Sequence, residues 1–227
     1  MCILVFPVAA LGSFSTSDLL GKFSPSKHRA FVRIDPQYAN RKGLYLRKEA
    51  YAAFKKMHVA ARKAGVHLVI VSATRNFYAQ KSIWERKWTG KRKVKGLNSQ
   101  LTDLQKATVI LRYSAMPGTS RHHWGTDIDL NHLENDYFAQ GKGLKIYQWL
   151  RKNASTYGFF QPYTSKAKGR TGYEEEKWHW SYAKTARQMH AAYQQRVTHQ
   201  TISGFAGSGT AKKLHVIQHY VNGISPK

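Results

Sequence analysis

The sequence predicts an α+β fold in which a central antiparallel sheet is flanked by helices. Segments with apolar residues at helical spacing are mixed with short runs typical of strands. The regular strand–helix–strand alternation that accompanies a parallel sheet is not found in this order of elements. The chain has 227 residues, of which 42% are hydrophobic and 13% aromatic, so one large domain can bury a substantial core.

The first half of the chain is predicted to contain three helices and one strand. Apolar residues recur at helical spacing in residues 45–64, and Gly65 then ends the helix. His67–Val71 is almost wholly apolar or β-branched, as in a strand that is covered on both faces. Helices are expected again over residues 77–84 and 101–111, on either side of a basic, turn-rich loop at 88–96.

The second half is predicted to contain three strands and three helices. Residues 124–131 and 178–182 have the composition of strands, and in the latter Trp178, Trp180 and Tyr182 alternate with other residues. A helix through residues 144–150 is expected to end by Gly158, ahead of a short strand at 159–160. The last two helices are placed at the segments that contain Met189 with Tyr193, and Leu214 with Ile217 and Val221.

Three parts of the chain are distinguished. Residues 1–18 include an apolar run, 3–12, whose length suits the core of a secretion signal, although no basic residue precedes Lys22. A buried first strand is the alternative for this run. Residues 19–200 form the main domain, and residues 201–227 are expected to be a helical tail packed on it. Cys2 is the one cysteine, which excludes an internal disulfide and a thiolate zinc cluster, and no apolar stretch is long enough to span a membrane.

The charge is strongly positive. Thirty-seven Lys and Arg residues stand against twelve Asp and Glu residues, which gives +25 at pH 7. Such a surface attracts polyanions, whether nucleic acid, acidic membranes or anionic cell-wall polymers, and the charge does not choose among them. Aromatic and basic residues are interleaved over residues 84–95, as in some nucleic-acid-binding modules. A solvated basic loop after a helix is the favoured interpretation of this stretch.

Three segments concentrate the residues that carry chemistry: Ser72–Arg75, Ser120–Leu130 and Glu174–Tyr182. Five of the twelve acidic residues lie within a few positions of histidines in the last two. A His and an Asp seven residues apart, joined through a glycine turn and a strand, can converge on one metal ion, and a second His from a neighbouring strand completes the set. Catalytic zinc takes three such ligands and leaves one position open. A nearby carboxylate that is not a ligand can then accept a proton.

Together these segments resemble the VanY-type D-alanyl-D-alanine carboxypeptidases, in the wider group of zinc peptidases that shares the hedgehog-like fold. The first motif of that group, S-x-H-x-x-G-x-x-x-D, is matched by Ser120, His122, Gly125 and Asp129. The second, E-x-W-H-x-x-Y, is matched by Glu176, Trp178, His179 and Tyr182. An arginine that follows a strand in an S-x-x-R setting, with a glutamine beyond it, is matched by Ser72, Arg75 and Gln80.

The resemblance implies a Zn²⁺ site and a role for each matched residue. The zinc ligands would be His122, Asp129 and His179. Glu176 would be the general base, and Arg75 would polarise the scissile carbonyl or stabilise the oxyanion. The residues expected to contact substrate are Ser120, Gln80, Trp178 and Tyr182. Asp127 is two residues from Asp129 and so on the same face of a strand, which makes it either a partner of the site or a competing ligand.

The implied function is hydrolysis of the terminal D-Ala-D-Ala bond of peptidoglycan stem peptides by a metal-activated water. A D,D-dipeptidase or an L-alanyl-D-glutamate endopeptidase could use the same zinc site, and a non-catalytic module that binds polyanions or nucleic acid is a further alternative. The expected partners are the stem peptide and anionic cell-wall polymers, with no specific nucleic acid and no membrane span. The chain is expected to be an exported monomer that acts in the periplasm or cell envelope.

Overall fold

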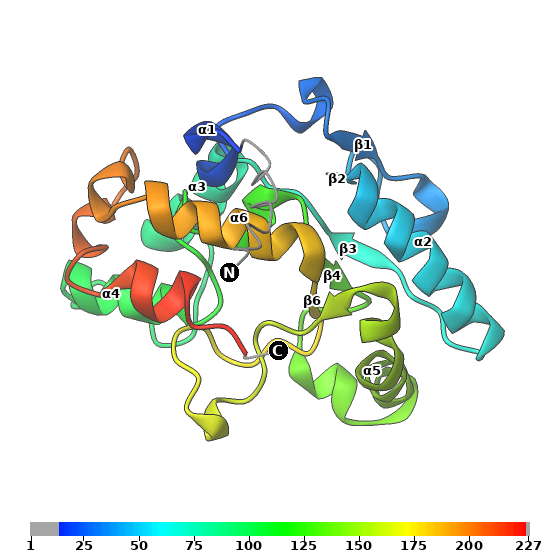
Figure 1. The fold of residues 1–227 in the computed structure, drawn as a ribbon. Helices are drawn as coiled ribbons and strands as arrows, with labels where there is room; N and C mark the ends of the chain where they lie inside the picture. The colour runs from blue at the N-terminus through cyan, green and yellow to red at the C-terminus, as the bar shows by residue number, and fades with distance from the viewer. Residues whose placement is uncertain (1–13, 226–227) are drawn as a thin grey trace, which may run out of the picture.

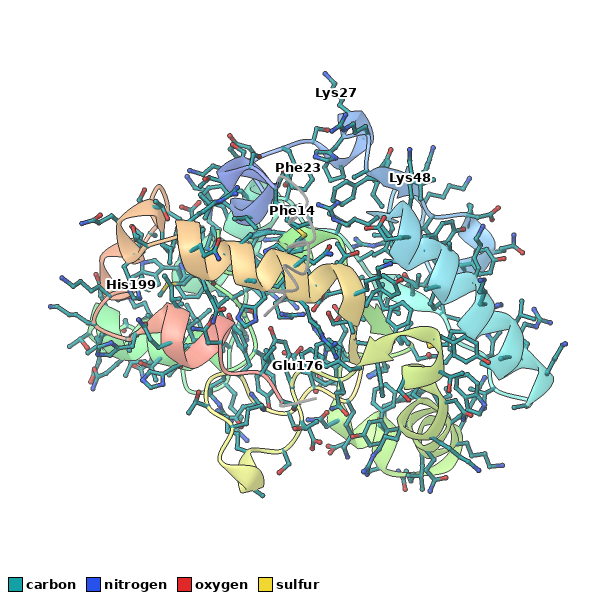
Figure 2. All side chains as sticks on the ribbon, in the orientation of Figure 1. Phe14, Phe23, Lys27, Lys48, Glu176 and His199 are labelled. Atoms are coloured by element: carbon teal, nitrogen blue, oxygen red, sulfur yellow. The ribbon has the colours of Figure 1, made fainter. Side chains whose placement is uncertain are left out.

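The computed structural model describes residues 14–225, so the apolar run at 3–12, expected to be a signal remnant or a first strand, lies outside the described residues. None of the helices within residues 14–225 combines the length and the apolar character that a membrane crossing requires. Basic side chains such as Lys27 and Lys48 project from the periphery into solvent, whereas Glu176 lies well inside the outline of the molecule (Figure 2).

A four-stranded antiparallel sheet lies between two groups of helices, which confirms the predicted fold class (Figure 1). Its strand order is β3-β4-β6-β5. The strands are β3 (Ile70–Ser72), β4 (Asp127–Leu130), β6 (His179–Tyr182) and β5 (Phe159–Phe160). A separate antiparallel pair is formed by β1 (Phe31–Arg33) and β2 (Tyr45–Arg47).

The two faces of the central sheet differ in chemistry, because successive side chains of a strand point to opposite sides. One face contributes Ile128, Leu130 and Trp180 to an apolar core. The same core takes in the buried residues of α2 (Lys48–Lys63) and α5 (Gly141–Asn153). On the other face Asp127 lies opposite Ser181 and Asp129 lies opposite His179. The sheet therefore presents acids and a histidine to one side only.

A second apolar core holds the helices of the polar side of the sheet together. It combines residues of four helices, α1 (Thr16–Leu20), α3 (Phe77–Trp88), α4 (Asp103–Leu111) and α6 (Ala183–Arg196). The final segment adds Ile202, Phe205, Val216 and Val221 to this core. That segment contains a single π-helical turn, Ile217–Val221, where the sequence predicted a longer helix from Leu214.

Two of the predicted element boundaries that differ from the structure have a clear tertiary cause. The helix expected over 45–64 begins at Lys48, because residues 45–47 pair with β1 instead. The strand expected over 124–131 is shorter, because Arg121–Trp124 forms a 3₁₀ turn that ends at Gly125. Gly125 has a φ of 69°, in the left-handed region that favours glycine.

Replacing Gly125 by alanine is expected to lower the free energy of unfolding by about 3 kcal/mol, from backbone strain and overpacking together. A Cβ at this position would overlap the ring of Phe31. Gly43→Ala is the matched control: Gly43 has a φ of 81° and nothing within 4 Å of an added Cβ. That variant should lose only about 1 kcal/mol. Equal losses in chemical denaturation of the two variants would contradict the close packing at Gly125.

Candidate metal centre and catalytic pocket

Side chains of His122, Asp129 and His179 meet at the polar face of the sheet. His122 comes from the 3₁₀ turn before β4, Asp129 from β4 itself and His179 from the start of β6. All three are buried, and one ligand atom from each lies within 4.8 Å of the others. His122 Nε2 is 3.4 Å from Asp129 Oδ2, and His179 Nδ1 is 3.2 Å from Asp129 Oδ1.

These spacings fit one tetrahedral zinc ion. Two ligand atoms that are each about 2.1 Å from such an ion lie about 3.4 Å apart. Asp129 Oδ1 is buried and accepts no hydrogen bond from residues 14–225, although His179 Nδ1 lies 3.2 Å away, and this is unusual for a carboxylate oxygen in a protein interior. A cation is the ligand that would satisfy an acid oxygen and two ring nitrogens facing one point. The cluster therefore fits the metal that its donor atoms suggest.

Hydrogen bonds at the far nitrogens fix the orientation of both histidines. His122 Nδ1 lies 2.8 Å from the carbonyl oxygen of Ala73, to which it donates, and this leaves the Nε2 lone pair facing the cluster. His179 has the opposite arrangement, since its Nε2 donates to Asp127 Oδ2 at 2.8 Å and its Nδ1 faces the cluster. Each ring is thus held in the tautomer that a metal ligand requires.

Asp127 lies behind the cluster rather than in it, which separates the roles of the two neighbouring aspartates. Its Oδ2 also accepts from Arg121 at 3.0 Å, and its Oδ1 accepts from Ser181 at 2.7 Å and Thr126 at 2.6 Å. Burial by itself would raise the pKa of Asp127, but Arg121 and His179 hold that pKa well below its usual range. With both oxygens already engaged, Asp127 positions His179, and Asp129 is the acid that faces the site.

Replacing Asp127 by asparagine is expected to weaken metal binding by about 10–100-fold, as for other outer partners of metal-bound histidines. The amide would bring an N–H group to an atom position that now accepts from donors. Asp129→Asn is the matched comparison and should weaken binding more, because it removes the negative charge at the cluster. Competition with a chelator of known affinity measures both variants. A larger loss in Asp127→Asn would reverse the assignment of the two aspartates.

Glu176 and Arg75 both lie beside the cluster, where they line the same cavity. Glu176 Oε2 is 3.2 Å from His179 Nδ1, and its side chain lines the cavity next to the three clustered residues. The guanidinium of Arg75 also lines this cavity, and its Nε is buried without a hydrogen-bond partner among the described residues. Burial lowers the pKa of His122, and the charge of Arg75 lowers it further. The arrangement offers a carboxylate and a fixed positive charge around one point.

The backbone on both sides of the site is held by buried polar side chains. His123 Nδ1 donates to the carbonyl of Arg75 at 2.6 Å, and its Nε2 accepts from the amide of Gly118 at 2.9 Å. With both nitrogens in use, and with burial lowering the pKa of His123 to about 3, this ring is a structural group. Arg170 holds the loop before Glu176 by donating to the carbonyls of Thr164, Tyr173 and Gly223.

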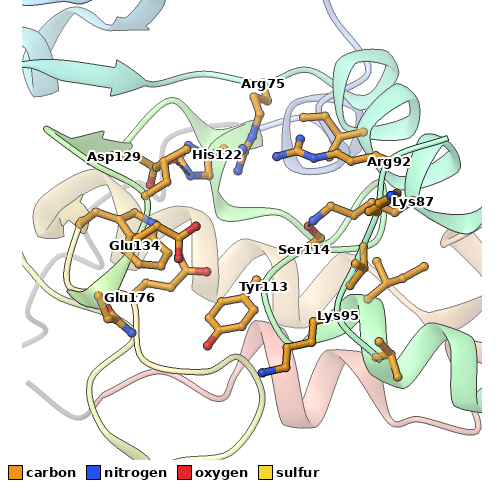
Figure 3. Close-up of a pocket in the computed structure, with 18 of the residues that line it drawn as sticks. Arg75, Lys87, Arg92, Lys95, Tyr113, Ser114, His122, Asp129, Glu134 and Glu176 are labelled. Atoms are coloured by element: carbon orange, nitrogen blue, oxygen red, sulfur yellow. Dashed lines mark hydrogen bonds and ion pairs between the residues drawn. The ribbon is translucent and has the colours of Figure 1, made fainter. Parts of the chain in front are cut away.

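The cluster opens into a cavity of about 620 Å³ (Figure 3). Trp178 lines this cavity, and Ser120 lines a smaller hollow of about 30 Å³ beside it, so both remain candidates for substrate contact. Gln80 and Tyr182 line neither of these two spaces. The Gln80 amide donates to the carbonyl of Ala115 at 2.7 Å. Tyr182 is on the apolar face of the sheet, where its ring packs on Phe159.

Several residues that shape the site were not predicted from the sequence. Arg121 lies within the first motif, and its pairing with Asp127 could have been suspected from the scarcity of acids near so many bases. The loop at 88–96 was interpreted as a solvated basic stretch, but its residues 92–95 line the cavity. Lys87, Tyr113 and Ser114 complete that wall. Tyr113 and Ser114 belong to no motif, and Lys87 lies in the interleaved basic and aromatic stretch at 84–95, whose pattern does not indicate a cavity wall.

Comparisons with known proteins agree with this geometry. A D-alanyl-D-alanine carboxypeptidase of Enterococcus faecalis is 32% identical over 126 residues, which cover 54% of this chain and 42% of that protein. The structure of the LD-carboxypeptidase LdcB, described in connection with peptidoglycan recognition, matches with a TM-score of 0.57 and 26% identity over 78% of this chain and 81% of LdcB.

The vancomycin-resistance D,D-pentapeptidase VanY, solved in complex with Zn(II), matches with a TM-score of 0.51 and 24% identity over 72% of this chain and 89% of that chain. It shares the fold, which confirms the expected hedgehog-like architecture. The chain spans about half the length of the curated relatives it matches. The sequence profile described as VanY, D-alanyl-D-alanine carboxypeptidase, matches residues 43–185, which contain every residue of the cluster. The chain belongs to the VanY family of D-alanyl-D-alanine carboxypeptidases.

Proposed function

We propose that this protein is a zinc-dependent carboxypeptidase that removes the terminal D-alanine from peptidoglycan stem peptides ending in D-Ala-D-Ala. The observation that carries the proposal is the meeting of His122, Asp129 and His179 within 4.8 Å, at the edge of a peptide-sized cavity. Family membership supports the reaction, and the Zn(II) complex of the pentapeptidase with the same fold supports the metal.

His122, Asp129 and His179 would hold the zinc ion. When bound, zinc supplies a Lewis acid that lowers the pKa of water to about 7, so that water can act as a nucleophile at neutral pH. Glu176 would accept the proton of the attacking water at its carboxylate and later deliver it to the leaving amine. Arg75 would place its guanidinium where the scissile carbonyl oxygen becomes negative, and burial strengthens that attraction.

A second candidate reaction differs only in the bond that is cut. LdcB is described as an LD-carboxypeptidase, and this protein matches it over 78% of the chain with the higher of the two TM-scores. Removal of a D-alanine from a stem one residue shorter could use the same ligands, base and arginine. The walls of the cavity rather than the metal ligands would decide which stem fits. To act on assembled peptidoglycan, the protein would have to be exported to the cell envelope.

A module that merely binds polyanions is less well supported. Such a module would leave the buried cluster of His122, Asp129 and His179 without a role. Arg92, Lys93 and Lys95 of the basic loop are exposed, but they also line the wall of the cavity beside that cluster.

Mass spectrometry of stem peptides incubated with the protein tests the proposal. A pentapeptide ending in D-Ala-D-Ala should lose one alanine, chelator should block the loss, and added zinc should restore it. A tetrapeptide substrate, treated in parallel, identifies the second candidate if it alone is shortened. Loss of a dipeptide or cleavage inside the stem would move the protein to one of the related peptidase activities. A zinc-loaded protein that cuts neither peptide would overturn the proposed function.

A further inference from the structure

The cavity is divided into an acidic end and a basic end (Figure 3). The acidic end holds the metal-ligand cluster and is lined by Asp129, Glu134, Asp136 and Glu176. The opposite wall is formed by the end of α3 and the loop that follows it, and carries Lys87, Arg92, Lys93 and Lys95. Asp129 and Glu176 have roles in the proposed reaction, whereas the cations on the opposite wall have none.

Lys87 is the best defined of these cations. It lies in the last turn of α3 with its side chain half-buried, and its Nζ donates to the hydroxyl of Ser114, a buried residue. Within residues 14–225 no carboxylate oxygen lies within 4.0 Å of its Nζ. Burial lowers the pKa of Lys87 to about 8, the charges of Arg92 and Arg75 lower it further, and the charge of Glu176 opposes the shift. The fold thus holds a half-buried cation with no described carboxylate within 4.0 Å of its ammonium.

Most of the lysines that the structure describes are exposed to solvent, so water compensates their positive charge. Lys91 and Lys93, in the same loop, are exposed, and water compensates their charge. Lys81 and Lys166 lie near the carboxylates of Glu85 and Glu174. Lys87 differs from both groups, since it is half-buried in a cavity wall and its ammonium is fixed by a hydroxyl. An ammonium has three N–H donors, and Ser114 accepts only one of them.

We propose that Lys87, oriented by Ser114 and supported by Arg92, binds a carboxylate of the peptide substrate at the end of the cavity opposite the metal-ligand cluster. The inference rests on the proposed function, because stem peptides carry carboxylates both at their terminus and further up the chain. Lys87 lines the cavity, and its ammonium has two N–H donors beyond the one given to Ser114, which a carboxylate can accept. Arg92 adds a second positive charge on the same wall. Lys87 would thereby select stems that keep this carboxylate free.

Kinetics of Lys87→Met on three related pentapeptides test the inference. One peptide has all carboxylates free, the second has its upstream carboxylate amidated, and the third has an amidated terminus. On the free peptide the variant should lose about 10–100-fold in kcat/KM, as expected for a charge-assisted hydrogen bond. On the peptide that lacks the carboxylate bound by Lys87, kcat/KM of the wild type should be lower than on the free peptide by a similar factor. The kcat/KM of Lys87→Met should be the same on these two peptides. The peptide that shows this pattern identifies which carboxylate Lys87 binds.

Lys91→Met is the matched control, since it removes the same charge from an exposed position outside the cavity lining and should leave kcat/KM unchanged. Metal content and thermal unfolding of Lys87→Met should equal those of the wild type.

An equal loss of kcat/KM in Lys87→Met on all three peptides, or no loss on any, would overturn the inference while the proposed function stands. If the wild type cleaves none of them, the proposed function fails, and calorimetric titration of the same peptides decides the inference. Binding that requires both Lys87 and one free carboxylate supports it, and binding indifferent to Lys87, or no binding, refutes it.

Discussion

Replacing Glu176 by glutamine should lower kcat by about 10³-fold, within the range that general acid–base groups contribute. The amide keeps the size of the side chain but cannot accept the proton of the attacking water. Because Glu176 Oε2 lies 3.2 Å from a ring nitrogen of His179, the carboxylate is beside the site where that water must be activated. The expected loss is in turnover, with bound zinc retained, since His122, Asp129 and His179 would provide the ligand atoms.

Two measurements on Glu176→Gln separate this role from others. Zinc content should stay near one ion per chain while release of D-alanine from the pentapeptide nearly stops. Glu175→Gln is the control, because Glu175 is the adjacent acid and lines neither the cavity nor the hollow beside it. That variant should retain wild-type turnover. Retained activity in Glu176→Gln would remove it from the role of base, and loss of zinc would make it a fourth ligand instead.

Replacing either His122 or His179 by alanine should remove zinc and activity together. Each histidine would supply one of the three ligand atoms that residues 14–225 offer at the cluster, so the loss of affinity should exceed the roughly 10–100-fold expected for an outer partner. The remaining ligands could not compensate, because Asp129 is the one carboxylate in that set. Metal analysis after dialysis, with parallel assays of D-alanine release, measures both effects.

His132→Ala is the matched control for removing a histidine. His132 is exposed and stacks on Tyr137, away from the cluster, so its loss should change neither zinc content nor turnover. Restored activity of His122→Ala at high zinc concentration would still agree with a ligand role. Undiminished zinc in His122→Ala or His179→Ala at low metal concentration would refute the ligand set.

The sequence predicted the residues that converge on the site better than those around it. His122, Asp129 and His179 stand in motifs whose spacing reflects a glycine turn and two paired strands, so local pattern was sufficient to suggest their meeting. The choice between Asp127 and Asp129 needed the structure, because both lie on one face of β4. What separates them is Arg121, which is buried against Asp127.

Two residues that the sequence analysis expected to contact substrate, Tyr182 and Gln80, line neither the cavity nor the hollow beside it. Tyr182 follows His179 by three positions in β6, so strand alternation puts it on the opposite face, and that periodicity was the better guide than its place in a motif. Gln80 is turned toward the carbonyl of Ala115, a contact across 35 residues that no local pattern specifies. The pair β1 and β2 was missed for a similar reason, since strands of three residues are too short to show a period.

The two-sided sheet has a consequence for how this protein can vary. In β4, acids that serve the site alternate with Ile128 and Leu130 of the core, so one inserted or deleted residue would exchange the two sets. The same error would place carboxylates among apolar side chains and isoleucine at the metal ligands. Insertions and deletions in these strands would therefore disrupt folding and the site together. Substitutions that change substrate preference without disrupting folding are therefore expected in the loops that line the cavity.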